Sequence, residues 1–116
     1  GSLSTALLQE LQPAVLLQAT PVGSLGRDPE ERLLPDHQVP EGCVVLDMVY
    51  QPPWTRFLRD AQAAGGVAVP GAAMFLGQAR AQVRHFTGHT VDAPLLRSCL
   101  AGTAAAVVDG KLAGGR

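Results

Sequence analysis

Tyrosine and aspartate stand where an apolar segment ends, and both could do chemistry there. Residues 44–49 are apolar except for Asp47, and Tyr50 follows directly. A tyrosine at a strand end can place its hydroxyl in a cleft while its ring packs; a tyrosine at a wet boundary is an equally good interpretation. Asp47 would need partners if buried. We interpret it as a structural acceptor of backbone N–H groups near the Pro52–Pro53 turn rather than as a general base.

Gln78 is a second candidate because it can both donate and accept a hydrogen bond, which suits a polyhydroxylated ring. Met74 lies four residues earlier, so both side chains share one stripe of an expected helix. A solvated helical glutamine without function is the commoner case. The buried face of this helix is predicted from a different stripe, which comprises Phe75, Ala79, Val83 and Phe86.

Other reactive side chains give weaker signals. His85 and His89 are four residues apart, but Gly88 separates them and no third ligand stands near, so we expect no metal site. Cys43 and Cys99 lie far apart in different elements and indicate free thiols rather than a disulfide. No residue pattern in the chain indicates a catalytic group.

Composition limits the possible class of protein. The chain has 116 residues, 47% hydrophobic and 16% charged, which indicates a single globular domain. The net charge is −1 and no basic run exists, so nucleic acid is not an expected partner. No apolar stretch approaches the roughly 20 residues of a membrane span, and the start has no basic region of a signal peptide. We therefore expect no membrane contact and a cytoplasmic location.

Apolar periodicity and turn residues predict an α/β fold. Strands are expected at 14–19, 43–50 and 67–69, and helices at 3–11, 55–64, 72–86 and after Asp92, which can cap the last one. The order of these elements favours a three-stranded parallel sheet with crossover helices. Ligands of such sheets bind at the carboxyl ends of the strands. Met48 and Tyr50 would then face a ligand.

Three segments carry a resemblance to a known family. QATPVG at 18–23, LDMVYQPPWTRFLRDAQAAGG at 46–66 and GAAMFLGQARAQVRHFTG at 71–88 resemble consecutive motifs of shikimate dehydrogenases, including the dehydrogenase domains of bifunctional and pentafunctional shikimate-pathway proteins. The resemblance covers roughly residues 13–100. It implies that residues 1–100 form the C-terminal half of a Rossmann-type NADP-binding domain, with 101–116 as a tail.

The resemblance also implies an activity and six site residues. The family reduces 3-dehydroshikimate to shikimate with NADPH. The family's phosphate loop and its catalytic lysine and aspartate match nothing in this chain, where the one lysine, Lys111, lies in the tail. The isolated chain is therefore expected to be inactive, and a non-catalytic regulatory or assembly domain is the alternative. By resemblance, the cofactor-binding residues are Thr20, Met48, Gly71 and Met74, and the substrate-binding residues are Tyr50 and Gln78.

Two features qualify these assignments. Gln18 replaces the family's usual asparagine, and Ser24 stands where methionine is common in the family, so this chain departs from the family pattern at two positions near Thr20. Gly71 would let the cofactor ring lie against the backbone, although a plain turn after Val69 is the simpler explanation.

A Rossmann order would also leave the strand at 14–19 as an edge without lysine, proline or charge. We expect this edge to self-associate, or to be covered by the N-terminal segment or the missing N-terminal half.

Overall fold

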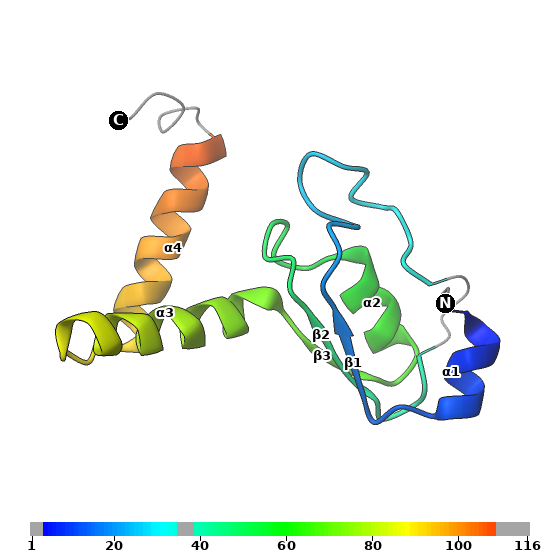
Figure 1. The fold of residues 1–116 in the computed structure, drawn as a ribbon. Coiled ribbons are helices and arrows are strands. Elements are labelled where there is room, and N and C mark those ends of the chain that lie inside the picture. The colour runs from blue at the N-terminus through cyan, green and yellow to red at the C-terminus, as the bar shows by residue number, and fades with distance from the viewer. Residues whose placement is uncertain (1–3, 35–38, 109–116) are drawn as a thin grey trace. The chain divides into compact units, whose positions relative to one another are not determined.

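The chain forms two compact units in a computed structural model that describes residues 4–34 and 39–108. The first unit is Gly1–Met74 and the second is Phe75–Arg116 (Figure 1). The single domain that the sequence suggests over residues 1–100 stays a prediction.

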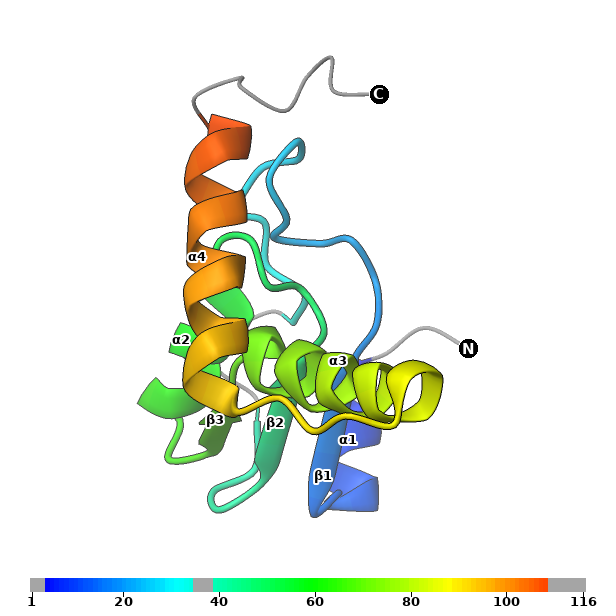
Figure 2. The same cartoon turned by 90° about the vertical axis from the view of Figure 1, so that its left-hand side faces the viewer.

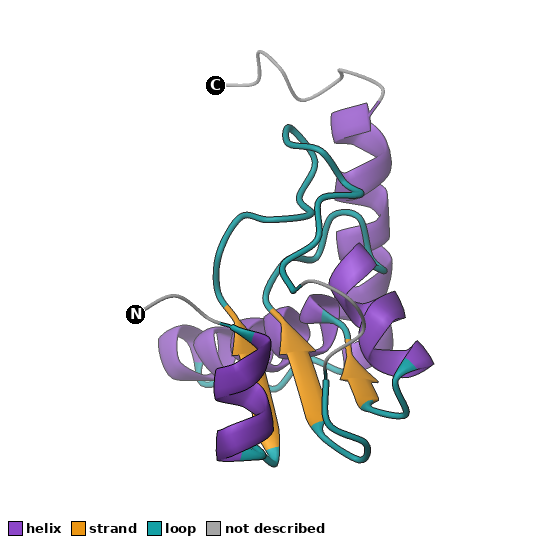
Figure 3. Cartoon of the chain, turned by 90° about the vertical axis from the view of Figure 1, so that its right-hand side faces the viewer, coloured by secondary structure: helices purple, strands orange, loops and turns teal. Residues whose placement is uncertain are grey.

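A parallel sheet of three strands lies at the centre of the first unit (Figure 3). The strands are β1 (Val15–Gln18), β2 (Val44–Asp47) and β3 (Val67–Val69), in the order β1-β2-β3. The register places Val15 beside Val44 and Val44 beside Val67. Valine favours such strands because its β-branched side chain packs well on a pleated surface. The predicted α/β fold with a three-stranded parallel sheet is confirmed.

Two helices of the first unit begin at polar caps. α1 (Thr5–Leu11) begins after Ser4, whose hydroxyl accepts a hydrogen bond from the amide of Leu7 at 3.2 Å. α2 (Arg56–Ala63) begins after Thr55, whose hydroxyl accepts from the amide of Leu58 at 3.3 Å. These bonds satisfy amide groups that have no partner within a helix. The cap predicted at Thr55 is confirmed.

One face of the sheet carries the core. Leu8 of α1 and Phe57 and Leu58 of α2 are buried in one cluster with Val45 of β2. Burying these side chains supplies most of the stabilisation of a small unit, at about 25 cal/mol for each Å² of apolar surface. Val15, at the start of β1, is 62% exposed. The core of the first unit therefore lies on the face of the sheet to which α1 and α2 supply side chains.

The middle strand is shorter than the sequence suggests. We predicted a strand over 43–50, but β2 ends at Asp47. The carboxylate of Asp47 accepts a hydrogen bond from the amide of Val49 at 2.9 Å, so this amide is not part of the ladder. The amide of Met48 still donates to the carbonyl of Gln18 at 2.9 Å. Tyr50 consequently lies in the loop after the strand rather than at its last position.

The second unit contains most of α3 (Gly71–Thr87) and all of α4 (Ala93–Val108). Figure 2 shows the short connection between these helices. Gly88 has a φ of +73°, and the carboxylate of Asp92 accepts from the amide of Leu95 at 2.9 Å, which confirms the predicted cap. α4 reaches Val108, so the helix continues past the predicted start of the tail at residue 101.

Another prediction about the second unit is wrong. Phe86 was assigned to a buried helical stripe, but it is 80% exposed, and Phe75 of the same stripe is also exposed. The 3.6-residue spacing alone does not show which stripe of a weakly amphipathic helix is buried. Lys111 lies outside the described residues. No helix in the described part of the chain is long and apolar enough to cross a membrane.

Candidate functional site

A pocket of about 450 Å³ lies at the carboxyl ends of β1 and β2 in the first unit. It is built from the two segments that follow these strands, which is where parallel α/β sheets bind ligands. Its lining combines apolar side chains with hydroxyl and amide groups. The lining residues are Ala19, Thr20, Pro21, Ser24, Leu25, Met48, Val49, Tyr50 and Gln51.

Three of the six site residues expected from the family motifs line this pocket. They are Thr20, which follows β1, and Met48 and Tyr50, which follow β2. Met48 and Tyr50 are 39% and 40% exposed, so both side chains are open to a ligand. The sheet brings these residues together although nearly thirty positions separate them in the sequence. Their roles in binding stay predictions.

The side chain of Gln18 holds the turn that carries Thr20. Gln18 is buried at the end of β1. Its amide nitrogen donates to the carbonyl of Val22 at 3.1 Å, and its amide oxygen accepts from the backbone amide of Thr20. One side chain thus joins the two ends of the 18–22 turn. The family comparison of residue types gave no hint of this role, but a glutamine at the end of an apolar strand before Thr-Pro could have indicated it.

Asp47 holds the segment that follows β2, as Gln18 holds the turn that follows β1. Its side chain is fully buried and accepts from the hydroxyl of Thr55 at 2.6 Å and from the amide of Val49 at 2.9 Å. Burial raises the pKa of the Asp47 carboxyl, while these two hydrogen bonds act in the opposite direction. The carboxylate has structural partners on both oxygens. This agrees with the structural role predicted for Asp47 and corrects one detail, because one of its partners is a hydroxyl.

Gly71 must be glycine for a reason that the sequence did not show. A Cβ at this position would lie 2.6 Å from the carbonyl oxygens of Asp47 and Val49 and 2.9 Å from the carbonyl carbon of Met48. These are backbone atoms, which cannot move aside cheaply. The first residue of α3 therefore packs directly on the chain that leaves β2. This contact explains the glycine without any cofactor ring.

The other predicted residues lie outside the pocket lining. Gly71 is buried, and Met74 is half-buried one turn further along α3. Gln78 is exposed and belongs to the second unit, so its predicted role in substrate binding is not connected to this pocket by the structure. Sequence reasoning also missed lining residues that carry no motif, among them Leu25 and Gln51.

Comparison with curated proteins finds a consistent set of relatives, whereas no family model matches the chain. The chain is 39% identical over 104 residues to the NADP(+) shikimate dehydrogenase of Chlorobium phaeovibrioides, covering 86% of this chain and 35% of that protein. It is 38% identical over 92 residues to the same enzyme of Thermus thermophilus, covering 79% of this chain and 34% of the relative. The chain thus spans about a third of the length of the curated relatives it matches.

Solved structures agree. Shikimate 5-dehydrogenase of Listeria monocytogenes, in complex with shikimate and NAD, gives a TM-score of 0.72 at 25% identity, covering 83% of this chain and 34% of that one. The shikimate 5-dehydrogenase of Thermus thermophilus, in complex with NADP(H) and shikimate, gives a TM-score of 0.62 at 35% identity. The match covers 77% of this chain and 38% of that one. The chain is a relative of the shikimate dehydrogenases. The predicted resemblance and the Rossmann-like fold are thereby confirmed.

A third similar structure belongs to a reductase with a different name. The ligand-free 5-ketofructose reductase of Gluconobacter sp. strain CHM43 gives a TM-score of 0.69 at 28% identity, covering 89% of this chain and 35% of that chain. This chain is thus also similar in structure to a reductase that is named for a keto sugar.

The pocket of this shikimate dehydrogenase relative suits one part of a nicotinamide cofactor. Met48 offers an exposed thioether that can lie against a planar ring, and Thr20 and Tyr50 offer hydroxyl groups. The 116 residues contain no Gly-x-Gly-x-x-Gly sequence, which typically binds the pyrophosphate. The residues present therefore fit the reactive end of such a cofactor better than its phosphates.

Proposed function

We propose that this chain forms one wall of the active site of an NADP-dependent shikimate dehydrogenase, which reduces 3-dehydroshikimate to shikimate. The observation that supports this most strongly is the meeting of Thr20, Met48 and Tyr50 in one pocket at the carboxyl ends of β1 and β2. By the resemblance each matches a family position, and the curated relatives of this chain are named as NADP(+) shikimate dehydrogenases.

In this proposal the chain positions the reactants. NADPH, when bound, supplies the hydride. Met48 lies against the nicotinamide, and Thr20 lines the cofactor. Gly71 and Met74 complete the cofactor side at the start of α3. Tyr50 hydrogen-bonds a hydroxyl group of the substrate ring, which helps to orient its carbonyl carbon for hydride transfer. The resemblance to the family assigns a second such hydrogen bond to Gln78. No residue of this chain is assigned the proton transfer.

A second candidate function is reduction of a different polyhydroxylated ketone. It is favoured by the similarity to 5-ketofructose reductase, which extends over 89% of this chain. Both substrate types carry hydroxyl groups near a carbonyl, so a tyrosine and a glutamine would suit either one. A direct comparison of the two ketones as substrates separates these candidates. A protein that reduces neither would support the non-catalytic regulatory or assembly domain.

We also propose that the edge of β1 is covered by a second copy of this chain, by the N-terminal segment or by the N-terminal half of the domain. In the described residues β1 pairs with β2 alone, and Val15 and Leu17 are 62% and 60% exposed. Exposed strand edges recruit partners through their free N–H and C=O groups. Light scattering of the chain should report a dimer or larger species. A monomer with rapidly exchanging amides at 14–19 would contradict pairing between copies.

The function is tested by steady-state kinetics on the protein of native length that contains this chain. Gln78→Ala should raise the Michaelis constant for shikimate more than that for NADP, because it removes a hydrogen bond to a neutral hydroxyl. Such a bond contributes roughly 0.5–1.5 kcal/mol, so the effect should be several-fold. Gln82→Ala, an exposed glutamine of the same helix, is the matched control. If both constants of Gln78→Ala equal those of the wild type, this assignment is wrong.

A further inference from the structure

The long connection between β1 and β2 begins at the rim of the pocket. Ser24 and Leu25 line the pocket, and the amide of Leu25 donates to the carbonyl of Gln51 at 2.9 Å. Further along, Leu34 is buried in the core cluster. Residues 24–34 thus form a loop that starts at the pocket and ends in the core.

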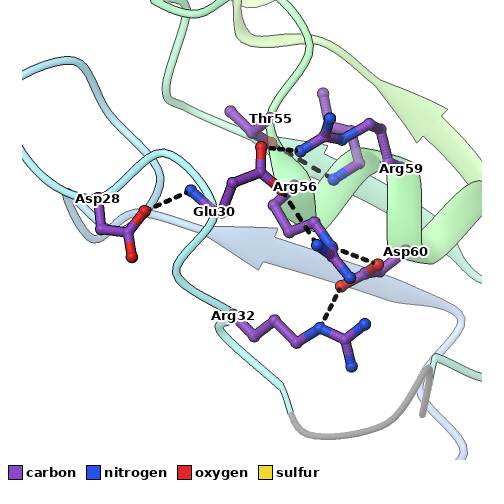
Figure 4. Close-up of polar contacts among 8 residues, drawn as sticks. Asp28, Glu30, Arg32, Thr55, Arg56, Arg59 and Asp60 are labelled. Atoms are coloured by element: carbon purple, nitrogen blue, oxygen red, sulfur yellow. Dashed lines mark hydrogen bonds and ion pairs between the residues drawn. The ribbon is translucent and has the colours of Figure 1, made fainter.

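The middle of this loop is attached to α2 by ion pairs (Figure 4). One carboxylate oxygen of Glu30 lies 3.1 Å from the guanidinium of Arg56, and the other lies 2.5 Å from that of Arg59. Arg32 lies 3.7 Å from Asp60, which also pairs with Arg56 at 2.9 Å. The five charges form one connected network between the loop and the helix, whereas isolated surface pairs contribute little.

Glu30 is the residue through which the loop engages both arginines. Its backbone amide donates to the carboxylate of Asp28 at 2.9 Å, which fixes the local turn (Figure 4). The hydrogen bonds from Arg59 and Arg56 lower the pKa of the Glu30 carboxyl, so it is charged at neutral pH. The helix that receives Glu30 begins after Thr55, whose hydroxyl donates to Asp47 at the end of β2. α2 and its cap therefore contact both the 24–34 loop and the end of β2.

We propose that Glu30 is a positioning residue: by bridging Arg56 and Arg59 it holds the 24–34 loop on α2 and so keeps Leu25 at the rim of the pocket. The position of the loop then depends on ionic strength, because the bridge is exposed and salt screens exposed charges. The part of this inference that concerns cofactor binding rests on the proposed function; the part that concerns the loop does not.

Hydrogen exchange of the Leu25 amide tests the loop directly, because this amide is bonded across the rim to Gln51. In Glu30→Gln its exchange should be roughly three- to tenfold faster than in the wild type. The control is Glu31→Gln, which removes a carboxylate that pairs at 3.8 Å with Arg27 of the same loop and not with α2. The Val45 amide in the core reports whether each variant remains folded. Equal Leu25 exchange in Glu30→Gln and the wild type overturns the proposal.

Two further measurements separate the loop from the function. Arg59→Gln should reproduce the faster Leu25 exchange, and about 0.5 M salt should raise the exchange of the wild type toward that of Glu30→Gln. An unchanged exchange rate of Leu25 in Arg59→Gln, or no effect of salt on the wild type, would overturn the proposed role of the bridge.

In the protein of native length, Glu30→Gln should weaken NADP binding several-fold relative to Glu31→Gln. If the wild type binds no NADP, the proposed function fails while the exchange data still decide the role of Glu30.

Discussion

The hydroxyl of Thr55 joins the start of α2 to the end of β2 by donating a 2.6 Å hydrogen bond to the buried carboxylate of Asp47. The same hydroxyl accepts from the amide of Leu58, so one side chain caps the helix and closes the loop that lies between them. That loop contains Met48 and Tyr50, two residues of the pocket. The pair therefore holds the segment on which ligand contact depends.

Replacing Asp47 by alanine should lower the free energy of unfolding by about 2–3 kcal/mol. The hydroxyl of Thr55 and the amide of Val49 would both lose their buried acceptor, and each such loss is costly. Asp47→Asn, which keeps one acceptor, should cost about 1 kcal/mol. Urea unfolding measures both, with the exposed Glu10→Gln as control. A loss for Asp47→Ala no larger than that of the control would contradict the structural role.

Asp47 also predicts a pH dependence. Burial raises the folded-state pKa of the Asp47 carboxyl above that of an unfolded aspartate, so between the unfolded-state and folded-state pKa the folded chain binds more protons than the unfolded chain. The free energy of unfolding should therefore rise as pH falls through this window, in the wild type relative to Asp47→Asn. Urea unfolding of both proteins from pH 7 to pH 4 gives this difference. The contributions of the other carboxylates to the pH dependence are the same in both proteins and cancel. A difference that shrinks toward low pH would show a lowered pKa instead.

The close contact at Gly71 predicts opposite effects for two glycines of one helix. Gly71→Ala should destabilise the chain by about 1–3 kcal/mol, because its Cβ would lie 2.6 Å from two carbonyl oxygens. Gly77→Ala meets no atom within 4 Å and should stabilise by up to about 1 kcal/mol through helix propensity. Thermal unfolding of the two variants provides the comparison. Stability equal to the wild type in Gly71→Ala would contradict the close packing of Gly71 on the end of β2.

Gln18 should prove important for the 18–22 turn. Gln18→Ala removes the bond to the carbonyl of Val22 and the acceptor of the Thr20 amide, so the Thr20 amide should exchange faster and stability should fall by about 1–3 kcal/mol. Gln18→Glu keeps the acceptor and loses the donor, so its effect should be smaller. Hydrogen exchange of Thr20 distinguishes them. Exchange as slow in Gln18→Ala as in the wild type would mean that the turn holds without this side chain.

Most of the fold could be predicted from the sequence because its signals are local. Short valine-rich runs indicated the strands, and Thr55 and Asp92 marked helix starts that the structure confirms. The end of β2 could not be predicted, since it depends on where the Asp47 carboxylate finds its partners. The buried stripe of α3 could not be predicted either, because apolar residues occur on several of its faces and Phe86 proved to be exposed.

Part of the candidate site could be predicted once the strands were recognised. Parallel strands place their carboxyl ends together, so Thr20, Met48 and Tyr50 could be expected at one edge of the sheet. The role of Gln18 and the packing reason for Gly71 depend on distances between segments that are remote in sequence. Glu30 is separated from Arg56 by 26 positions in the sequence and from Arg59 by 29. No periodicity of the sequence predicts contacts over such separations.

The central claim is that the pocket beside Met48 and Tyr50 serves an NADP-dependent shikimate dehydrogenase. The most direct measurement is reduction of NADP by shikimate, catalysed by the protein of native length, in parallel with NADPH oxidation by 5-ketofructose. The account predicts shikimate-dependent NADP reduction whose Michaelis constant for shikimate rises several-fold in Tyr50→Phe, with no comparable rate for the keto sugar. A folded protein that gives no NADP reduction with shikimate would contradict the account.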